Sequence, residues 1–405
     1  MRNCFCSKIV FLLLAFFLTA SASLASVDGA RIKEIIILGN TRTNKEVIRR
    51  QLPFVEGDYW RNEFEDLTYS RIQDMNCFDP MTLRITTEPL SGGEIRVVVR
   101  VSDPHILYFD PLEFLLFKLQ DLLHQSYSQI FYNPFGTGLN LSAGGGWGAN
   151  PWFSLGFKQS LQDGWLLRGK LQWFDTTRRF YPFNDPPQYH SSGFSTSISF
   201  NRHATGVWQY GGLLNYSPVR VALDGAGEVE QAYLSIGSDF RWLKPVEFNL
   251  AFRYSLDLAG NFPSYPSVTA GLTRSLSVGG GNQLLSSLYG GYMPPFAPLN
   301  RLYAIGGFGH VPIRGFSQSF TGHIYFVTSL EYRHSLPGNI WLLAFVDRGR
   351  MWSEHDKTSD YDWEIGAGLG LAVDTPLGYP FRVDFAYGLT GETGLAWRMG
   401  LDLNF

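Results

Sequence analysis

Side chains able to do covalent or metal chemistry are scattered through this sequence and do not gather into a motif. It contains no G-x-S-x-G nucleophile turn and no H-E-x-x-H metal site, and the eight His and three Cys show no metal-ligand spacing. Gly366, Gly368 and Gly370 could suggest nucleotide binding, but they alternate within a strand pattern that no helix follows. We therefore expect no catalytic residue, no metal site and no cofactor, and an enzyme such as a lipase or protease lacks support.

The composition is that of a folded protein rich in aromatic side chains. Of 405 residues, 45% are apolar and 16% aromatic, whereas only 17% are charged. Beyond the N-terminus no apolar run is long enough for a membrane-spanning helix, so we expect strands to carry the aromatic residues. The formal net charge of -3 argues against nucleic acid as a partner.

Residues 1–25 have the three parts of a secretory signal peptide: a basic start with Arg2 and Lys8, an apolar run, and small residues before the cleavage point. The mature protein is therefore expected to leave the cytoplasm. Two cysteines depart with this segment and only Cys77 remains. Packing and hydrogen bonds, not an internal disulfide, must then stabilise the fold.

The segment 31–103 mixes strands and helices and predicts a small α+β domain. Thr43, with Glu46 three residues later, predicts the start of its first helix. A turn at 91–93 separates its last two strands. The expected order is strand 31–38, helix 43–52, helix 60–75, strand 83–88 and strand 94–102.

A linker, residues 104–136, follows this domain and contains leucines at helical spacing. Asp110 and Pro111 can serve as its N-cap and first-turn residues. The leucines that share one face are Leu112, Leu115, Leu116, Leu119, Leu122 and Leu123. Such an amphipathic helix either lies at a membrane surface or packs against its neighbours as a linker helix, and general packing favours the second alternative.

Residues 137–405 alternate between apolar and polar side chains. From Val246 to Leu258 the even positions are apolar, and mostly polar or charged residues lie between them. A soluble sandwich would also alternate, but strands that face lipid, with Trp and Tyr at the membrane interfaces, explain the aromatic content as well. We therefore expect an all-β transmembrane antiparallel barrel of about 14 strands. The segments are 137–147, 151–161, 164–175, 192–202, 206–217, 229–242, 246–258, 267–279, 282–293, 322–334, 338–349, 362–374, 380–389 and 394–405.

The longest connection between these segments, 294–321, is rich in glycine and aromatic residues, which suggests an ordered and functional loop. Its later part contains Ile313, Arg314, Gly315 and Phe316. The strand that follows the next turn contains Phe345, Asp347 and Gly349.

With these two motifs the chain resembles the superfamily that joins periplasmic POTRA domains to an outer-membrane barrel, which includes outer-membrane protein assembly barrels and two-partner secretion transporters. Segment 31–103 resembles one POTRA domain. A late-strand pattern around Gly366, Arg382 and Asp384 and the terminal aromatic Phe405 also match. The resemblance implies 16 strands, whereas the alternation gives about 14. It also implies several POTRA domains in the assembly barrels or two in the secretion transporters, whereas we find one in this sequence.

The resemblance also implies that the loop folds back into the lumen, where Arg314 meets Asp347. A desolvated arginine needs a carboxylate, and a bidentate pair is its strongest geometry. We therefore expect a loop–lumen lock formed by Arg314, Gly315, Phe316, Phe345, Asp347 and Gly349. An exposed arginine worth under about 1 kcal/mol is the alternative.

The implied function is insertion of outer-membrane proteins or translocation of polypeptide across the bacterial outer membrane, with the POTRA domain in the periplasm. Expected partners are unfolded outer-membrane or secreted polypeptides, the lipid bilayer, and periplasmic chaperones or accessory lipoproteins. Glycine weakens strand pairing, so we expect a weak barrel seam between the first strand, with Gly144, Gly145 and Gly146, and the last strand, which ends at Phe405. A passive, porin-like solute pore is the alternative function.

Overall fold

The computed structural model describes residues 28–401, apart from 81, 109–110, 124, 149, 180–187, 206–207, 224–226, 244–245, 307–312, 317–319, 353–362, 375–379 and 391–394. The expected signal peptide 1–25 and Phe405 lie outside the described residues. None of the described helices has the length and apolar character that crossing a bilayer requires.

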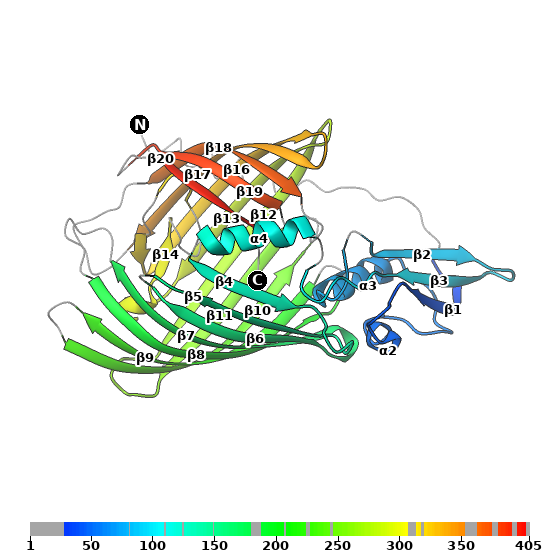
Figure 1. Cartoon of the computed structure of the whole chain (residues 1–405), viewed down its shortest axis with the longest axis horizontal. Helices are drawn as coiled ribbons and strands as arrows, with labels where there is room; N and C mark the ends of the chain where they lie inside the picture. The colour runs from blue at the N-terminus through cyan, green and yellow to red at the C-terminus, as the bar shows by residue number, and fades with distance from the viewer. Residues whose placement is uncertain are drawn as a thin grey trace.

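A small α+β unit, here called the N-terminal unit (residues 28–103), precedes a large curved sheet (Figure 1). Its elements follow the expected order. They are β1 (Arg31–Leu38), α2 (Lys45–Arg49), α3 (Glu63–Asp74), β2 (Arg84–Pro89) and β3 (Glu94–Arg100). The three strands pair in the order β1-β3-β2, with β1 parallel and β2 antiparallel to β3. Buried side chains such as Ile32, Ile48, Ile72 and Val97 form the core between sheet and helices.

The first helix begins differently from the prediction. Asn44 is its N-cap, and the Asn44 side chain accepts a hydrogen bond of 2.9 Å from the backbone N–H of Glu46. The Thr43 hydroxyl instead donates to the carboxylate of Asp103, which also accepts the Thr43 backbone N–H at 3.1 Å. The predicted Thr43 cap is therefore wrong, because a carboxylate distant in sequence takes up that hydroxyl.

One helix, α4 (Pro111–Leu123), leads into an antiparallel sheet of 15 strands. Neighbours in this sheet are consecutive except that β13 pairs with β16. The strands are β4 (Ser126–Phe131), β5 (Leu139–Gly146), β6 (Trp152–Ser160), β7 (Trp165–Arg179), β8 (Gln188–His203), β9 (Trp208–Leu223), β10 (Gly227–Trp242), β11 (Glu247–Asp257), β12 (Tyr265–Gly279), β13 (Asn282–Tyr292), β16 (Ile324–Leu336), β17 (Ile340–Trp352), β18 (Glu364–Asp374), β19 (Pro380–Gly388) and β20 (Leu395–Leu401).

Each of the 14 expected segments coincides with one strand from β5 to β20, and β4 is a further short strand. Because β4 has six residues and lies within the expected linker 104–136, the sheet begins before residue 137. The described residues do not reach the 16 strands that the resemblance implied.

Alternation places apolar side chains on the outer face of the sheet. On β17, Leu342 and Val346 are 46% and 40% exposed, whereas Phe345 and Asp347, at alternate positions, are buried. On the outer face, aromatic rings of β7 to β11 pack side by side near the turns that face the N-terminal unit, with Trp208 and Trp242 centroids 3.9 Å apart. An apolar outer face with such an aromatic belt is typical of barrels that sit in a membrane.

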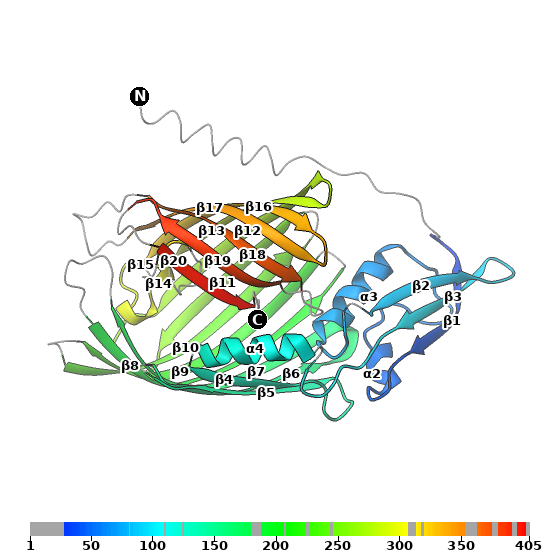
Figure 2. The same cartoon turned by 45° about the horizontal axis from the view of Figure 1, so that its top comes forward.

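The sheet curls round but is not closed by strand pairing. Among the described residues, no ladder joins β20 to β4. Helix α4 contacts both strands and lies between them in both views (Figures 1 and 2).

The predicted seam is therefore misplaced on its N-terminal side. Gly144, Gly145 and Gly146 lie on β5, which is paired on one side with β4 and on the other with β6. Gly144 and Gly146 instead make room for the Trp152 side chain, because a Cβ at Gly144 would lie 3.1 Å from its indole ring and one at Gly146 would collide with that ring. Among the described strands, the edge of the sheet is β4, which the sequence pattern did not reveal.

Candidate functional site

The connection between β13 and β16 folds into the interior of the curved sheet. It forms the short hairpin of β14 (Tyr303–Ile305) and β15 (Phe320–Gly322). Its apolar side chains join inward-facing side chains of β10, β12, β16 and β17 in one buried cluster. We call this the interior cluster: Tyr233, Tyr265, Met293, Ala297, Tyr303, Ile305, Ile313, Phe316, Tyr325, Val327 and Met351.

Glycines in the loop and on the wall allow the two to approach closely. Gly315 has a φ of 100°, and a Cβ there would lie 2.7 Å from the backbone carbon of Tyr387. A Cβ on Gly366 would collide with the backbone carbonyl of Arg314, and one on Gly349 with the side chain of Ile313. The backbone of β17, β18 and β19 is thus shaped to hold residues 313–316.

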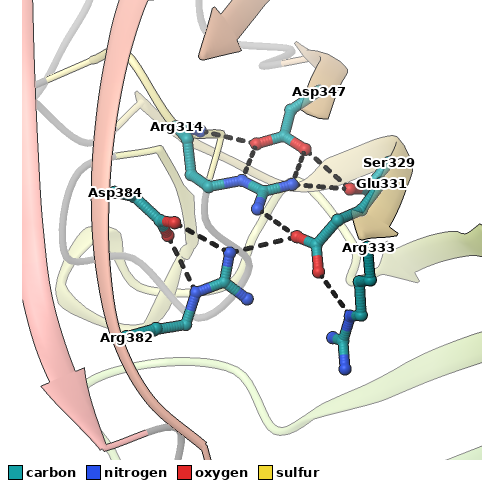
Figure 3. Close-up of polar contacts among 7 residues, drawn as sticks. All are labelled: Arg314, Ser329, Glu331, Arg333, Asp347, Arg382 and Asp384. Carbon is teal, nitrogen blue, oxygen red and sulfur yellow. Dashed lines mark hydrogen bonds and ion pairs between the residues drawn. The ribbon is translucent and has the colours of Figure 1, made fainter. Parts of the chain in front are cut away.

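Arg314 and Asp347 form a bidentate ion pair (Figure 3). Arg314 Nε donates to Asp347 Oδ2 at 2.6 Å, and Nη2 donates to Oδ1 at 2.7 Å. The backbone N–H of Arg314 also donates to Oδ2 at 2.9 Å. The guanidinium lies 3.5 Å from the centroid of the Phe345 ring. The carboxylate therefore fixes both the side chain and the backbone of the loop.

The pair extends into a larger network, which we call the lumen lock (Figure 3). Arg314 Nη1 donates to Glu331 Oε2 at 2.6 Å, and Arg382 Nη2 donates to the same oxygen at 3.0 Å. Arg382 also pairs with Asp384 at 2.9 Å. The members of the lumen lock are Arg314, Ser329, Glu331, Arg333, Asp347, Arg382 and Asp384.

Charge balance makes this buried network stable. Three guanidinium groups meet three carboxylates, and the Asp347 and Glu331 side chains are only 1% and 4% exposed. Removing one partner of a buried ion pair leaves an uncompensated charge, which costs about 3 to 5 kcal/mol. The loop is therefore held by interactions that are costly to break one at a time.

The structure brings all six residues of the expected lock together: Arg314, Gly315, Phe316, Phe345, Asp347 and Gly349. Sequence reasoning gave no partner role to Glu331, Ser329 or Arg333. Their alternation on β16 was a signal, because Ser329, Glu331 and Arg333 share the inner face with Val327. Arg382 and Asp384 were matched to the family pattern without a role.

A second polar region joins the N-terminal unit to the rim of the sheet. Asp74 on α3 pairs with His203 Nε2 at 2.7 Å, and the Asn140 amide donates to the Met75 carbonyl at 2.7 Å. Arg71 donates to the His203 carbonyl at 3.3 Å. We call these contacts the rim junction. Burial raises the pKa of the Asp74 carboxyl, but the hydrogen bond and charge of His203 outweigh it, so that the net pKa lies below its usual range.

No group of three or more metal-ligating side chains occurs among the residues described. Cys77 is buried, and burial raises the pKa of its thiol to about 12, so it is unreactive at neutral pH. The described residues of the lumen lock and the interior cluster provide ion pairing and packing.

Comparison with known proteins agrees with this geometry. Residues 258–401, which include the lumen lock, match the Omp85 superfamily domain. The superfamily resemblance inferred from the two motifs is therefore confirmed over this stretch. No curated protein sequence matches the chain.

Solved structures with a similar fold include CdiB from Acinetobacter baumannii and CdiB from Escherichia coli. Both superpose with a TM-score of 0.61 at 15% and 16% identity, covering 92% of this chain and 73% and 75% of theirs. BamA from Haemophilus ducreyi lacking POTRA domains 1-3 matches with a TM-score of 0.52 at 14% identity, over 91% of this chain and 83% of its own. At these identities the likeness concerns the fold.

Proposed function

We propose that the protein is an outer-membrane barrel whose N-terminal unit is a periplasmic POTRA domain, and that it inserts outer-membrane proteins or translocates polypeptide across the outer membrane. The observation that carries this proposal is the loop locked inside the curved sheet by Arg314, beside a wall that no strand pairing closes among the described residues. A passive solute pore needs neither feature, and the interior cluster occupies space that a pore would use.

The proposed organisation is a signal peptide at 1–25, a POTRA domain at 31–103, a linker at 104–136 and a barrel at 137–405, with β4 added to the wall from within the linker. Partners of this arrangement are unfolded polypeptides, the lipid bilayer, and periplasmic chaperones or accessory lipoproteins.

The N-terminal unit supports a role in handling extended polypeptide. One edge of its sheet is covered, because residues 57–60 bond to β1 through Ile32 N–H to Asp58 carbonyl and Trp60 N–H to Ala30 carbonyl, both 2.8 Å. The other edge is β2, which pairs only with β3 among the described strands. An exposed strand edge can recruit an extended peptide by adding a strand.

Deletion of residues 31–102 tests the proposal. We expect the truncated protein to lose insertion or export of polypeptide, because the peptide-binding edge and the rim junction are both removed. Ion conductance in planar bilayers and the gel mobility shift on heating are measured in parallel to check that the barrel remains folded. A folded truncated barrel that retains full function would contradict the proposal and favour the passive pore.

A further inference from the structure

The outer edge of β4 is bonded by groups that do not belong to a strand. In an antiparallel strand the N–H and C=O of every second residue point to the same side. At Ser128, Ile130 and Tyr132 these groups meet side chains or the linker: Tyr132 N–H donates to the Ile106 carbonyl at 2.7 Å, and the Gln129 amide donates to the Ile130 carbonyl at 2.7 Å. In a closed barrel this edge of β4 would pair with β20. Here it is occupied by side chains and by the linker.

Helix α4 supplies the central pair of these groups. The Asp121 carboxylate accepts the Ser128 backbone N–H at 2.9 Å and its hydroxyl at 3.0 Å. The Lys118 ammonium donates to the Ser128 carbonyl and lies 3.3 Å from Asp121. An acceptor and a donor side by side offer Ser128 what the C=O and N–H of a neighbouring strand would offer. Lys118 and Asp121 therefore stand in for a strand at this position.

Among the described residues, the polar contacts between α4 and β4 gather at Lys118 and Asp121. Lys118 also lies 4.0 Å from the ring centroid of Tyr127, which anchors this face of the helix on β4. A neighbouring stripe of α4 is exposed, with Leu115, Leu119 and Leu122 63%, 45% and 66% accessible. By contrast, two paired strands such as β13 and β16 share ladder bonds over their whole length.

We propose that α4 is a removable cover of the β4 edge, and that an extended segment of an incoming polypeptide takes the place of Asp121 and Lys118 as the partner of Ser128. This inference rests on the proposed function and selects release sideways into the bilayer over export through the lumen. Lys118 and Asp121 are positioning residues of this cover. The lumen lock stays closed while the cover moves, because its buried ion pairs are costlier to separate.

A disulfide that fixes α4 to β4 tests the inference. Asp121 Oδ1 and Ser128 Oγ are 3.0 Å apart, so the two side chains face each other, and the double variant Asp121→Cys with Ser128→Cys brings two thiols next to each other. The matched control is Ser235→Cys with Ser255→Cys, whose hydroxyl oxygens are 2.8 Å apart on the paired strands β10 and β11. Cys77 is buried and does not compete.

The assay follows insertion of a urea-unfolded eight-stranded outer-membrane barrel protein into vesicles of phosphatidylcholine and phosphatidylethanolamine that contain the full mature protein. We expect the oxidised 121–128 pair to reduce the insertion rate at least tenfold and a reductant to restore it, whereas oxidation of the 235–255 pair changes nothing. Recovery on reduction shows that the variant is folded.

Three results are decisive. Full activity of the oxidised 121–128 protein beside an active wild type would overturn the cover and leave the proposed function standing. A wild type that does not accelerate insertion would overturn both the cover and insertion of outer-membrane proteins as the function. Deletion of residues 31–102 would then test export of polypeptide separately. As a second variant, Asp121→Asn keeps the shape but removes the charge, and we expect it to insert the substrate faster than wild type; an unchanged or slower rate would contradict the role of Asp121.

Discussion

Two regions of the molecule, the lumen lock in the interior and the seam between β20 and β4, are held together in different ways. The lumen lock joins Arg314 to Asp347 and Glu331, whose carboxylates are almost fully buried, and the interior cluster packs beside it. At the seam, the Lys118–Asp121 pair on α4 bonds to Ser128 at the β4 edge, and leucines of the same helix are exposed. In the proposed mechanism the loop is therefore the permanent support, and the seam is the part of the wall that opens.

The largest effect is expected when the lumen lock loses its arginine. Arg314→Met leaves Asp347 and part of Glu331 without their cation, so the free energy of unfolding should fall by about 3 to 5 kcal/mol. Urea unfolding in detergent micelles, followed by tryptophan fluorescence, measures this change.

The matched control for this variant is Arg220→Met. Arg220 pairs with Glu230 at 3.3 Å, but their side chains are 66% and 74% exposed, so the loss should stay below about 1 kcal/mol. Equal stability of the Arg314 and Arg220 variants would contradict the stabilising role of the lumen lock.

A smaller effect is expected when the wall behind the loop is made bulkier. Gly366→Ala places a methyl group against the Arg314 carbonyl, so the loop must shift, at a cost of about 1 to 3 kcal/mol. Gly290→Ala is the control, because a Cβ there meets only the Tyr325 carbonyl at 3.6 Å. Protease sensitivity of the connection 294–321 should rise in the first variant alone, and a loop that stays protected would show that the close fit is not needed.

The rim junction should give the smallest effect, because the Asp74 side chain is 34% exposed although its partner His203 is buried. Asp74→Asn should weaken the junction by about 1 kcal/mol, as is typical of one hydrogen bond. Hydrogen exchange of α3 measures this opening.

The rim junction should also respond to acid. His203 holds the pKa of Asp74 below its ordinary value of 3.8, so the stabilisation is complete above that pH and is lost as the pH falls through the lower folded value. The Asp74→Asn variant should lack this acid response. The same response in wild type and variant would assign the titration to other groups.

Sequence periodicity predicts most strands of the wall. The sequence predicts the central pair of the lumen lock, but it does not predict the strand at the seam. Strict alternation locates the strands from β5 to β20, and the two motifs locate Arg314 and Asp347. Glu331 and Arg382 meet from strands 51 positions apart in sequence, which periodicity alone does not show. The six residues of β4 are too few for a clear pattern beside the leucine-rich helix, so the true edge was missed. Similarly, the Thr43 hydroxyl does not cap the helix, because it donates to Asp103, a tertiary contact that the local sequence does not show.

Two backbone amides test the central comparison most directly, because each donates to an aspartate at the same distance. The Ser128 N–H donates to Asp121 at 2.9 Å at the seam, and the Arg314 N–H donates to Asp347 at 2.9 Å in the lumen lock. Residue-resolved hydrogen exchange of the full mature protein in lipid nanodiscs compares them. We predict that Ser128 exchanges at least tenfold faster than Arg314 and becomes protected when unfolded barrel polypeptide is added. Faster exchange at Arg314, or an Arg314 amide that opens with substrate while Ser128 stays protected, would contradict the account.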